Sequence, residues 1–263
     1  MRYLSLCLIT KDESQYLPEW LDWHRKLGVE HFYIYDNGTQ DHLGSLLTQD
    51  DVTFHRVLGR GVQMATYRHC IAEHGHESNW IGFIDTDEFI VPRKFDDLPS
   101  MLNSYERFGG LGINWLMFGT SGLLTKPESQ VRSLIFRTPN HYSANDHIKS
   151  IVQPRYVLPQ VPANPHSFSY KEGAFCVNEL GTPIQGPFSR NSTTLVQLNH
   201  YYCRSRQEID EKLKRGRADT GTCRSLEEFL SVDRIATVED RTACELKERL
   251  DRRPSSSMLS DMP

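Results

Sequence analysis

The chain has 263 residues, of which 38% are hydrophobic and 24% are charged, and its formal net charge is −4. This composition is typical of a folded globular chain and excludes a fully disordered one. The small negative charge gives no reason to expect nucleic acid as a partner. The six cysteines form no CxxC pair, which argues against a disulfide framework and a zinc site. The apolar run 3–9 is too short for a signal peptide, so we expect a cytoplasmic protein.

The first half of the chain alternates short apolar runs with amphipathic segments. The expected strands are residues 4–9, 31–35, 52–57 and 80–84, and the expected helices are residues 11–27 and 63–74. Thr10 and Glu13 have the spacing of a capping box, and Gly28 is a suitable residue to end the first helix. This order predicts an α/β fold with a mostly parallel, Rossmann-type central sheet and helices on both faces. Such sheets bind ligands at the carboxyl ends of their strands.

The second half is less regular. Strands are expected at residues 110–118, 148–157 and 194–202, with loops over 158–190. Ser205 with Glu208, and Ser225 with Glu228, form two further capping boxes, each of which should open a C-terminal helix. We expect one domain over residues 1–253 and a disordered tail over 254–263.

Acidic clusters follow three of the expected strands, at residues 11–13, 36–37 and 85–87. In a parallel sheet these clusters would meet in one crevice. Asp85 and Asp87, two residues apart behind an apolar strand, suit a hard divalent cation such as Mn²⁺ or Mg²⁺. Such a cation could hold a diphosphate and neutralise a departing phosphate. The alternative is a simple polar turn.

Several segments resemble glycosyltransferases of the GT-A type, in particular the bacterial group related to glycosyltransferase family 2, and glycosyltransferase family 92. The matching segments, in chain order, are 11–13, 16–24, 27–29, 31–37, 80–89, 114–115, 118–122, 147–152, 199–202, 204–205 and 215–219. They span nearly the whole chain. One departure is Asp12, where such sequences usually have asparagine.

The resemblance implies a nucleotide pocket at the ends of the first strands. Asp36 would contact the uracil or the ribose, because a carboxylate accepts bonds from hydroxyl and imide groups. Lys11, Asp12 and Glu13 would line the base. The alternative for Asp36 is a structural turn with the glycine that follows.

The resemblance also implies a metal site formed by Asp85, Asp87 and a late histidine, His200. Asp85 would additionally contact the donor. A neutral imidazole favours Mn²⁺ over Mg²⁺. The alternative for His200 is a histidine that only packs in the core.

A basic run between 204 and 217 allows two interpretations. Arg215 and Arg217 flank Gly216, and their guanidinium groups could close on the diphosphate of a donor. The alternative is a solvated helix whose charges pair along its own surface.

Together these features predict a metal-dependent, inverting glycosyltransferase that uses a nucleotide-sugar donor, most readily a UDP-sugar. The acceptor is expected to be a glycan or a lipid-linked glycan, with peripheral membrane association left open. Asp146 is our first candidate for the base that deprotonates the acceptor, ahead of Glu172 and Glu179. The alternative functions are a non-catalytic nucleotide- or glycan-binding module and a nucleotidyltransferase.

Overall fold

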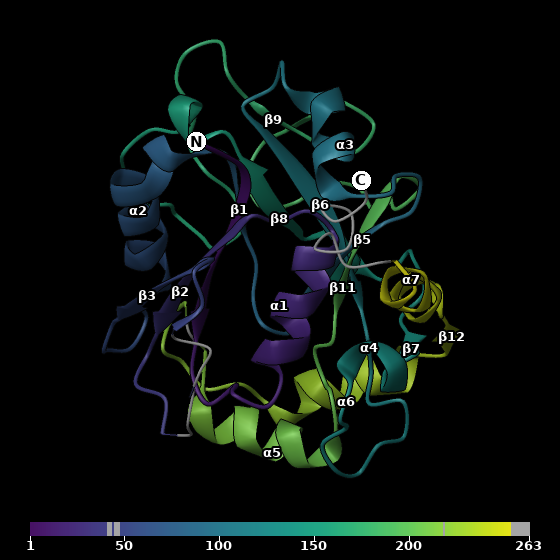
Figure 1. Cartoon of the computed structure of the whole chain (residues 1–263). Coiled ribbons are helices and arrows are strands. Elements are labelled where there is room, and N and C mark those ends of the chain that lie inside the picture. The colour runs from purple at the N-terminus through teal and green to yellow at the C-terminus, as the bar shows by residue number, and fades with distance from the viewer. Residues whose placement is uncertain (41–43, 45–47, 218, 254–263) are drawn as a thin grey trace, which may run out of the picture.

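The computed structural model describes residues 1–40, 44, 48–217 and 219–253 (Figure 1). The predicted disordered tail, 254–263, lies outside the described residues. The strands are β1 (Arg2–Thr10), β2 (His31–Asp36), β3 (Val52–Arg56), β4 (Ser78–Phe83), β5 (Glu88–Pro92), β6 (Gly110–Met117), β7 (Phe136–Arg137), β8 (Ile148–Val152), β9 (Cys176–Val177), β10 (Pro183–Ile184), β11 (Val196–His200) and β12 (Val238–Glu239). The helices are α1 (Leu17–Lys26), α2 (Gln63–His74), α3 (Leu98–Leu102), α4 (Gln130–Ser133), α5 (Arg206–Arg215), α6 (Leu226–Ile235) and α7 (Thr242–Asp251).

A mixed sheet forms the centre of the molecule, with strand order β10-β9-β6-β8-β4-β1-β2-β3. The four N-terminal strands β1 to β4 pair only in parallel with one another. The antiparallel strand β8 joins this parallel half to β6. The predicted α/β class and the parallel arrangement of the first four strands are therefore confirmed, and the second half of the sheet is mixed.

Helices cover both faces of the parallel half because the side chains of β1 alternate between them. Leu6 and Leu8 pack in the cluster that contains the α1 residue Trp20. Cys7 packs in a second cluster with Tyr67 of α2. Both sets of side chains are buried, as expected for a strand between two helical layers. The predicted helices on both faces are confirmed.

The C-terminal helices position the site. In Figure 1, β1 runs from the top towards the bottom of the view, and α5 and α6 lie across the bottom, beyond the carboxyl end of β1. The predicted capping box of α5 is present, since the side chain of Ser205 accepts from the Glu208 amide and Glu208 reaches back to Ser205. At α6 only half of the predicted capping box is present: the Ser225 side chain accepts from the Glu228 amide, whereas the Glu228 carboxylate pairs with Arg217.

Two expected boundaries are wrong. Thr10 is the last residue of β1 and does not cap α1, which begins only at Leu17, with a proline in its first turn. Proline favours the first turn because its missing amide hydrogen is not needed there. The strand expected over 148–157 ends at Val152, since Pro154 starts a short 3-10 turn.

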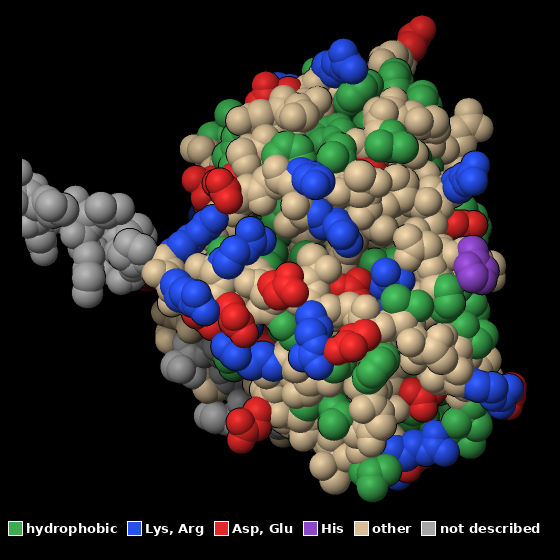
Figure 2. Space-filling view, turned by 90° about the vertical axis from the view of Figure 1, so that its right-hand side faces the viewer, with side chains coloured by type: hydrophobic (Ala, Val, Ile, Leu, Met, Phe, Trp, Pro, Cys, Tyr) green, Lys and Arg blue, Asp and Glu red, His purple; other side chains and the backbone are tan. Residues whose placement is uncertain are grey.

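Charges of both signs alternate on the face that carries α7. Figure 2 shows this face with Lys and Arg side chains next to Asp and Glu side chains. Asp251, the last residue of α7, pairs with Arg132 and with Lys247. Among the described residues, no helix combines the length and the apolar character that a membrane crossing requires.

Candidate active site

The acidic motif lies in the tight connection between β4 and β5. The amide of Glu88 donates to the Asp85 carbonyl over 3.0 Å, and the Asp85 amide donates to the Glu88 carboxylate over 2.7 Å. The indole of Trp20, on α1, donates to the Asp85 and Glu88 carbonyls. These bonds satisfy the buried backbone of the turn, so the side chains of Asp85 and Asp87 are held in fixed positions.

Pairing between β5 and β11 brings His200 to this turn from a position more than one hundred residues away. The two strands are antiparallel, with His200 opposite Glu88. The next residue, Tyr201, donates its amide to the Asp87 carbonyl over 2.8 Å. The end of β11 is therefore fastened directly to the acidic motif.

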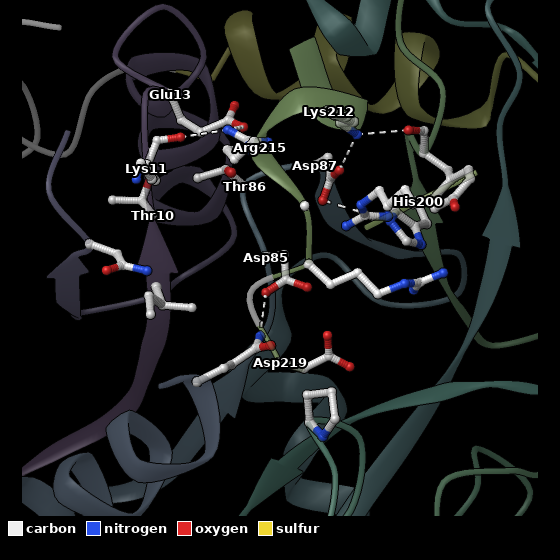
Figure 3. A pocket seen from close by; sticks show the side chains of 18 of the residues that line it. Thr10, Lys11, Glu13, Asp85, Thr86, Asp87, His200, Lys212, Arg215 and Asp219 are labelled. Atoms are coloured by element: carbon white, nitrogen blue, oxygen red, sulfur yellow. Dashed lines mark hydrogen bonds and ion pairs between the residues drawn. The ribbon is translucent and has the colours of Figure 1, made fainter. Parts of the chain in front are cut away.

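Lys212 and His200 both point at the Asp87 carboxylate (Figure 3). Lys212 Nζ lies 2.6 Å from Asp87 Oδ2, and His200 Nε2 lies 3.7 Å from Oδ1. Burial alone would raise the pKa of Asp87, but its basic neighbours, Lys212 first among them and Arg204 further off, together outweigh burial and hold that pKa well below the usual value. Burial lowers the pKa of His200 well below its ordinary value. Asp87 is therefore ionised at neutral pH, and His200 is a neutral imidazole.

Asp85 has a buried lysine of its own. Lys149, on β8, is 1% exposed, and its Nζ lies 2.8 Å from Asp85 Oδ2 and 3.3 Å from Glu88 Oε2. Gln63 donates to the other oxygen of Asp85 over 3.0 Å. Burial, with the neighbouring carboxylates, raises the pKa of Glu88 to about 8. Burial disfavours the charge of Lys149, but Asp85 and Glu88 outweigh this and raise the pKa of Lys149.

A cavity of about 940 Å³ opens in front of this turn. Eight of the predicted site residues line it: Lys11, Asp12, Glu13, Asp85, Asp87, His200, Arg215 and Arg217. Its size suits a small-molecule ligand. The carboxyl ends of β1 and β4, the end of β11 and the helix α5 therefore converge on one cavity.

The loop after β1 supplies one wall of the cavity. Glu13 is buried, and its carboxylate bonds to Arg204 over 2.6 Å and to Arg215 over 2.9 Å. Asp12 accepts from the Gln40 amide over 2.7 Å, which ties this loop to the one after β2. Lys11 is exposed, and its carbonyl accepts from Arg215 (Figure 3).

The two arginines of the basic run already have carboxylate partners. Arg215 bonds to Glu13, as above, and Arg217 bonds to Glu228 on α6. Gly216 separates them with a φ of +79°, a conformation that L-residues rarely adopt. Both side chains line the cavity, although neither is free of a protein partner.

Asp36 and Asp146 do not line the cavity with the other predicted residues. Asp36 is buried and accepts from the Thr39 amide over 2.9 Å, as in the turn that we considered as the alternative. Asp146 accepts from the Asn191 amide over 2.9 Å. Glu179 holds the amides of residues 194–196 with its two oxygens, and Glu172 is exposed. These contacts give Asp36, Asp146 and Glu179 structural partners.

The opposite wall is aromatic. Trp115 stacks on His147 with ring centroids 4.9 Å apart and lies 4.4 Å from the ring of His200. Tyr142 and Tyr202 line the same side. The cavity therefore combines a charged region, at Asp85 and Asp87, with an aromatic region beside it.

A divalent cation fits the corner between Asp87 and His200. Two ligands of one Mg²⁺ or Mn²⁺ ion, each at about 2.1 Å, can lie up to about 4 Å apart, and Asp87 Oδ1 and His200 Nε2 are 3.7 Å apart. The neutral imidazole leaves a lone pair for the cation. In the described part of the chain, no cluster of three or more His, Cys, Asp or Glu side chains could hold a metal. Of the three predicted ligands, Asp87 and His200 are the two whose side chains lie close enough to contact one such ion, since Asp85 is held by Lys149.

Sequence reasoning missed the two lysines. Lys149 is the one charged residue in the apolar run 148–152, and a charge in a buried strand indicates a partner. Lys212 gave a weaker signal, because it lies among five other basic residues in the run 204–217.

Comparison with known proteins places the chain in a family. The sequence model described as Glycosyltransferase family 92 matches residues 2–180, a range that includes the acidic motif but neither His200 nor α5. A family 92 protein of Oryza sativa subsp. japonica is 29% identical over 206 residues, covering 75% of this chain and 33% of that protein. One from Ricinus communis is 26% identical over 221 residues, covering 81% and 37%. The chain thus spans about a third of the length of these relatives.

Solved structures show only distant likeness. Glucosyl-3-phosphoglycerate synthase from Mycobacterium tuberculosis has a TM-score of 0.31 and 14% identity over 43% of this chain and 44% of that one. A 4-diphosphocytidyl-2C-methyl-D-erythritol synthase from Anaerococcus prevotii has a TM-score of 0.34 and 8% identity over 59% and 71%. At such low TM-scores and identities, the likeness says nothing about the function of this chain. On the match over residues 2–180, the chain belongs to glycosyltransferase family 92.

Proposed function

We propose that this chain forms the donor-binding and catalytic part of a metal-dependent, inverting glycosyltransferase that uses a UDP-sugar and a glycan acceptor. The observation that carries the proposal is the meeting of Asp87, His200 and Asp85 at the floor of one cavity that also holds the predicted loop 11–13. Family membership supports the reaction class. The cation rests on the positions of Asp87 and His200, whereas the UDP-sugar donor and the inverting course are carried over from the resemblance described in the sequence analysis.

The charged region suits a nucleoside diphosphate. A cation held by Asp87 and His200 would stabilise the charge that develops on the leaving diphosphate. Arg215 and Arg217 line the same cavity, and guanidinium groups match phosphate oxygens in geometry as well as charge. Each would exchange a carboxylate partner for a phosphate on donor binding.

The aromatic region suits the sugar and the acceptor. One face of a pyranose ring presents C–H groups, and such a face packs well against aromatic side chains. Trp115 and His147 offer that surface next to His200. Aromatic walls also exclude water, which limits hydrolysis of the donor.

Release of nucleotide from a panel of nucleotide sugars, with and without Mn²⁺, tests the proposal. We expect Mn²⁺-dependent release of UDP from at least one UDP-sugar, and its loss in Asp87→Asn. The matched control is Asp22→Asn, which removes a carboxylate that is 46% exposed on α1 and pairs with Lys26. Release that is equal in wild type and Asp87→Asn contradicts the proposal, and binding of UDP without release supports the non-catalytic alternative.

A further inference from the structure

Each carboxylate of the acidic motif is paired with a buried lysine. Lys149 contacts Asp85 and Lys212 contacts Asp87, and the two lysines are 1% and 3% exposed. Bringing two ammonium groups out of water is costly unless each has a close opposite charge. The pairs therefore compensate the charge of the motif before any ligand arrives.

Of the two lysines, only Lys212 contacts a carboxylate of the metal corner, the space between Asp87 and His200 where a cation would bind. Lys212 Nζ lies 2.6 Å from Asp87 Oδ2, whereas Oδ1 of the same carboxylate faces His200. Lys212 Nζ also donates to the Tyr202 carbonyl over 2.7 Å, which fixes the ammonium group beside the corner. Lys149, on β8, instead contacts Asp85 and Glu88.

A cation entering the corner would meet an ion pair rather than a free carboxylate. The ammonium group already neutralises Asp87, and it would repel a divalent charge at the adjacent oxygen. With a cation and Lys212 both present, the metal corner carries excess positive charge, and a nucleoside diphosphate would supply the negative charge that balances it. Binding of cation and diphosphate together is therefore more favourable than binding of the cation alone.

We propose that Lys212 acts as a resident counter-ion of Asp87 that keeps divalent cations weakly bound until a nucleoside diphosphate occupies the cavity. This inference rests on the proposed function, because it concerns the same metal corner. The dependence is reciprocal: if the diphosphate strengthens cation binding, the cation strengthens diphosphate binding by the same factor. Metal and donor then enter and leave the site as one unit.

Calorimetric titration of Mn²⁺ into the protein, without nucleotide and at saturating UDP, tests this proposal. For Lys212→Met we expect Mn²⁺ affinity without nucleotide to be at least about tenfold higher than in wild type, because a unit positive charge next to the ion has gone. The gain in Mn²⁺ affinity on adding UDP should shrink accordingly. Lys212→Arg keeps the charge and should resemble wild type.

Arg137→Met is the matched control. Arg137 pairs over 2.7 Å with Asp240, whose side chain is 4% exposed, and it does not line the cavity in front of Asp87. It should leave Mn²⁺ affinity close to that of wild type. Equal affinity in wild type and Lys212→Met, or an equal gain in Arg137→Met, overturns the proposal.

A second neutral variant shows whether a result for Lys212→Met comes from a folding defect of that variant. Lys212→Gln keeps a donor for the Tyr202 carbonyl and should behave as Lys212→Met.

The same titrations separate the role of Lys212 from the proposed function. Wild type that binds UDP with Mn²⁺ while all neutral variants keep wild-type Mn²⁺ affinity overturns only the role of Lys212. Wild type that binds neither Mn²⁺ nor UDP overturns the proposed function, and this inference with it.

Discussion

Replacing Arg204 by methionine should destabilise the fold strongly, because this side chain joins three parts of the chain. Arg204 is 2% exposed, and its Nη1 lies 2.6 Å from Glu13 Oε2 and 3.4 Å from Glu208 Oε1. Its Nε donates to Gln130 over 2.8 Å, and its guanidinium lies 4.5 Å from the Tyr16 ring centroid. Methionine keeps most of the packing volume and removes the charge and the donors.

The expected cost follows from the carboxylates left behind. Glu13 and Glu208 are buried, and removing one partner of a buried ion pair typically costs about 3–5 kcal/mol. Glu13 retains Arg215, which places the expected loss near the lower end of that range. For a chain of this size, each kcal/mol lowers Tm by about 2–4 °C, so a fall of roughly 6–12 °C is expected.

Urea denaturation at pH 7, followed by tryptophan fluorescence, measures this loss. Arg215→Met is the matched control, since Arg215 bonds to the other oxygen of Glu13 but is 29% exposed. A partly exposed pair contributes about 1 kcal/mol or less. If Arg204→Met and Arg215→Met lower the unfolding free energy equally, the reasoning about the buried network is wrong.

Three further predictions concern the site and the core. Asp87→Asn should lower UDP release by about 100-fold, as loss of one group that stabilises developing charge typically does, while circular dichroism shows a folded protein. His200→Gln should weaken Mn²⁺ binding measured calorimetrically at saturating UDP, whereas a lowered Tm with unchanged Mn²⁺ affinity would indicate a packing role. Burial lowers the pKa of His24 to about 3, so its contribution to stability is present above the ordinary pKa of 6.5 and is lost as pH falls towards 3. Between pH 6 and 4 the wild type should lose about 1.4 kcal/mol per pH unit from this group, and His24→Gln should show a shallower slope in urea denaturation.

The parallel half of the fold could be predicted because local signals there agree with the tertiary structure. Strands β1, β2 and β4 are mostly apolar runs, and β3, at the edge of the sheet, alternates apolar and polar residues. Gly28 follows α1 with a φ of +91°, as its position after the amphipathic segment suggested. The predicted start of α1 was wrong because Thr10 and Glu13 have the spacing of a capping box but do not form one. Glu13 is used by Arg204, 191 residues away in sequence, and no local pattern encodes that contact.

The candidate site was predictable by residue type and only partly by position. Strand ends must meet in a parallel sheet, so the loop 11–13 and Asp85 with Asp87 were placed correctly on one cavity. Asp146, our first candidate for the base, lies at the end of a 3-10 turn, and its carboxylate accepts from the Asn191 amide. The pairing of Lys212 with Asp87 depends on how α5 packs against the turn between β4 and β5. Packing between segments so far apart in the chain produces no recognisable residue spacing in the sequence.

The central claim is that the cavity in front of Asp87 binds a nucleoside diphosphate together with a divalent cation. Calorimetric titration of UDP into wild type and Asp87→Asn, each with and without Mn²⁺, tests this claim most directly. We predict that wild type binds UDP at least about tenfold more tightly with Mn²⁺ than without it, and that Asp87→Asn loses this gain. UDP affinity that is the same in both proteins, with or without Mn²⁺, would contradict the account.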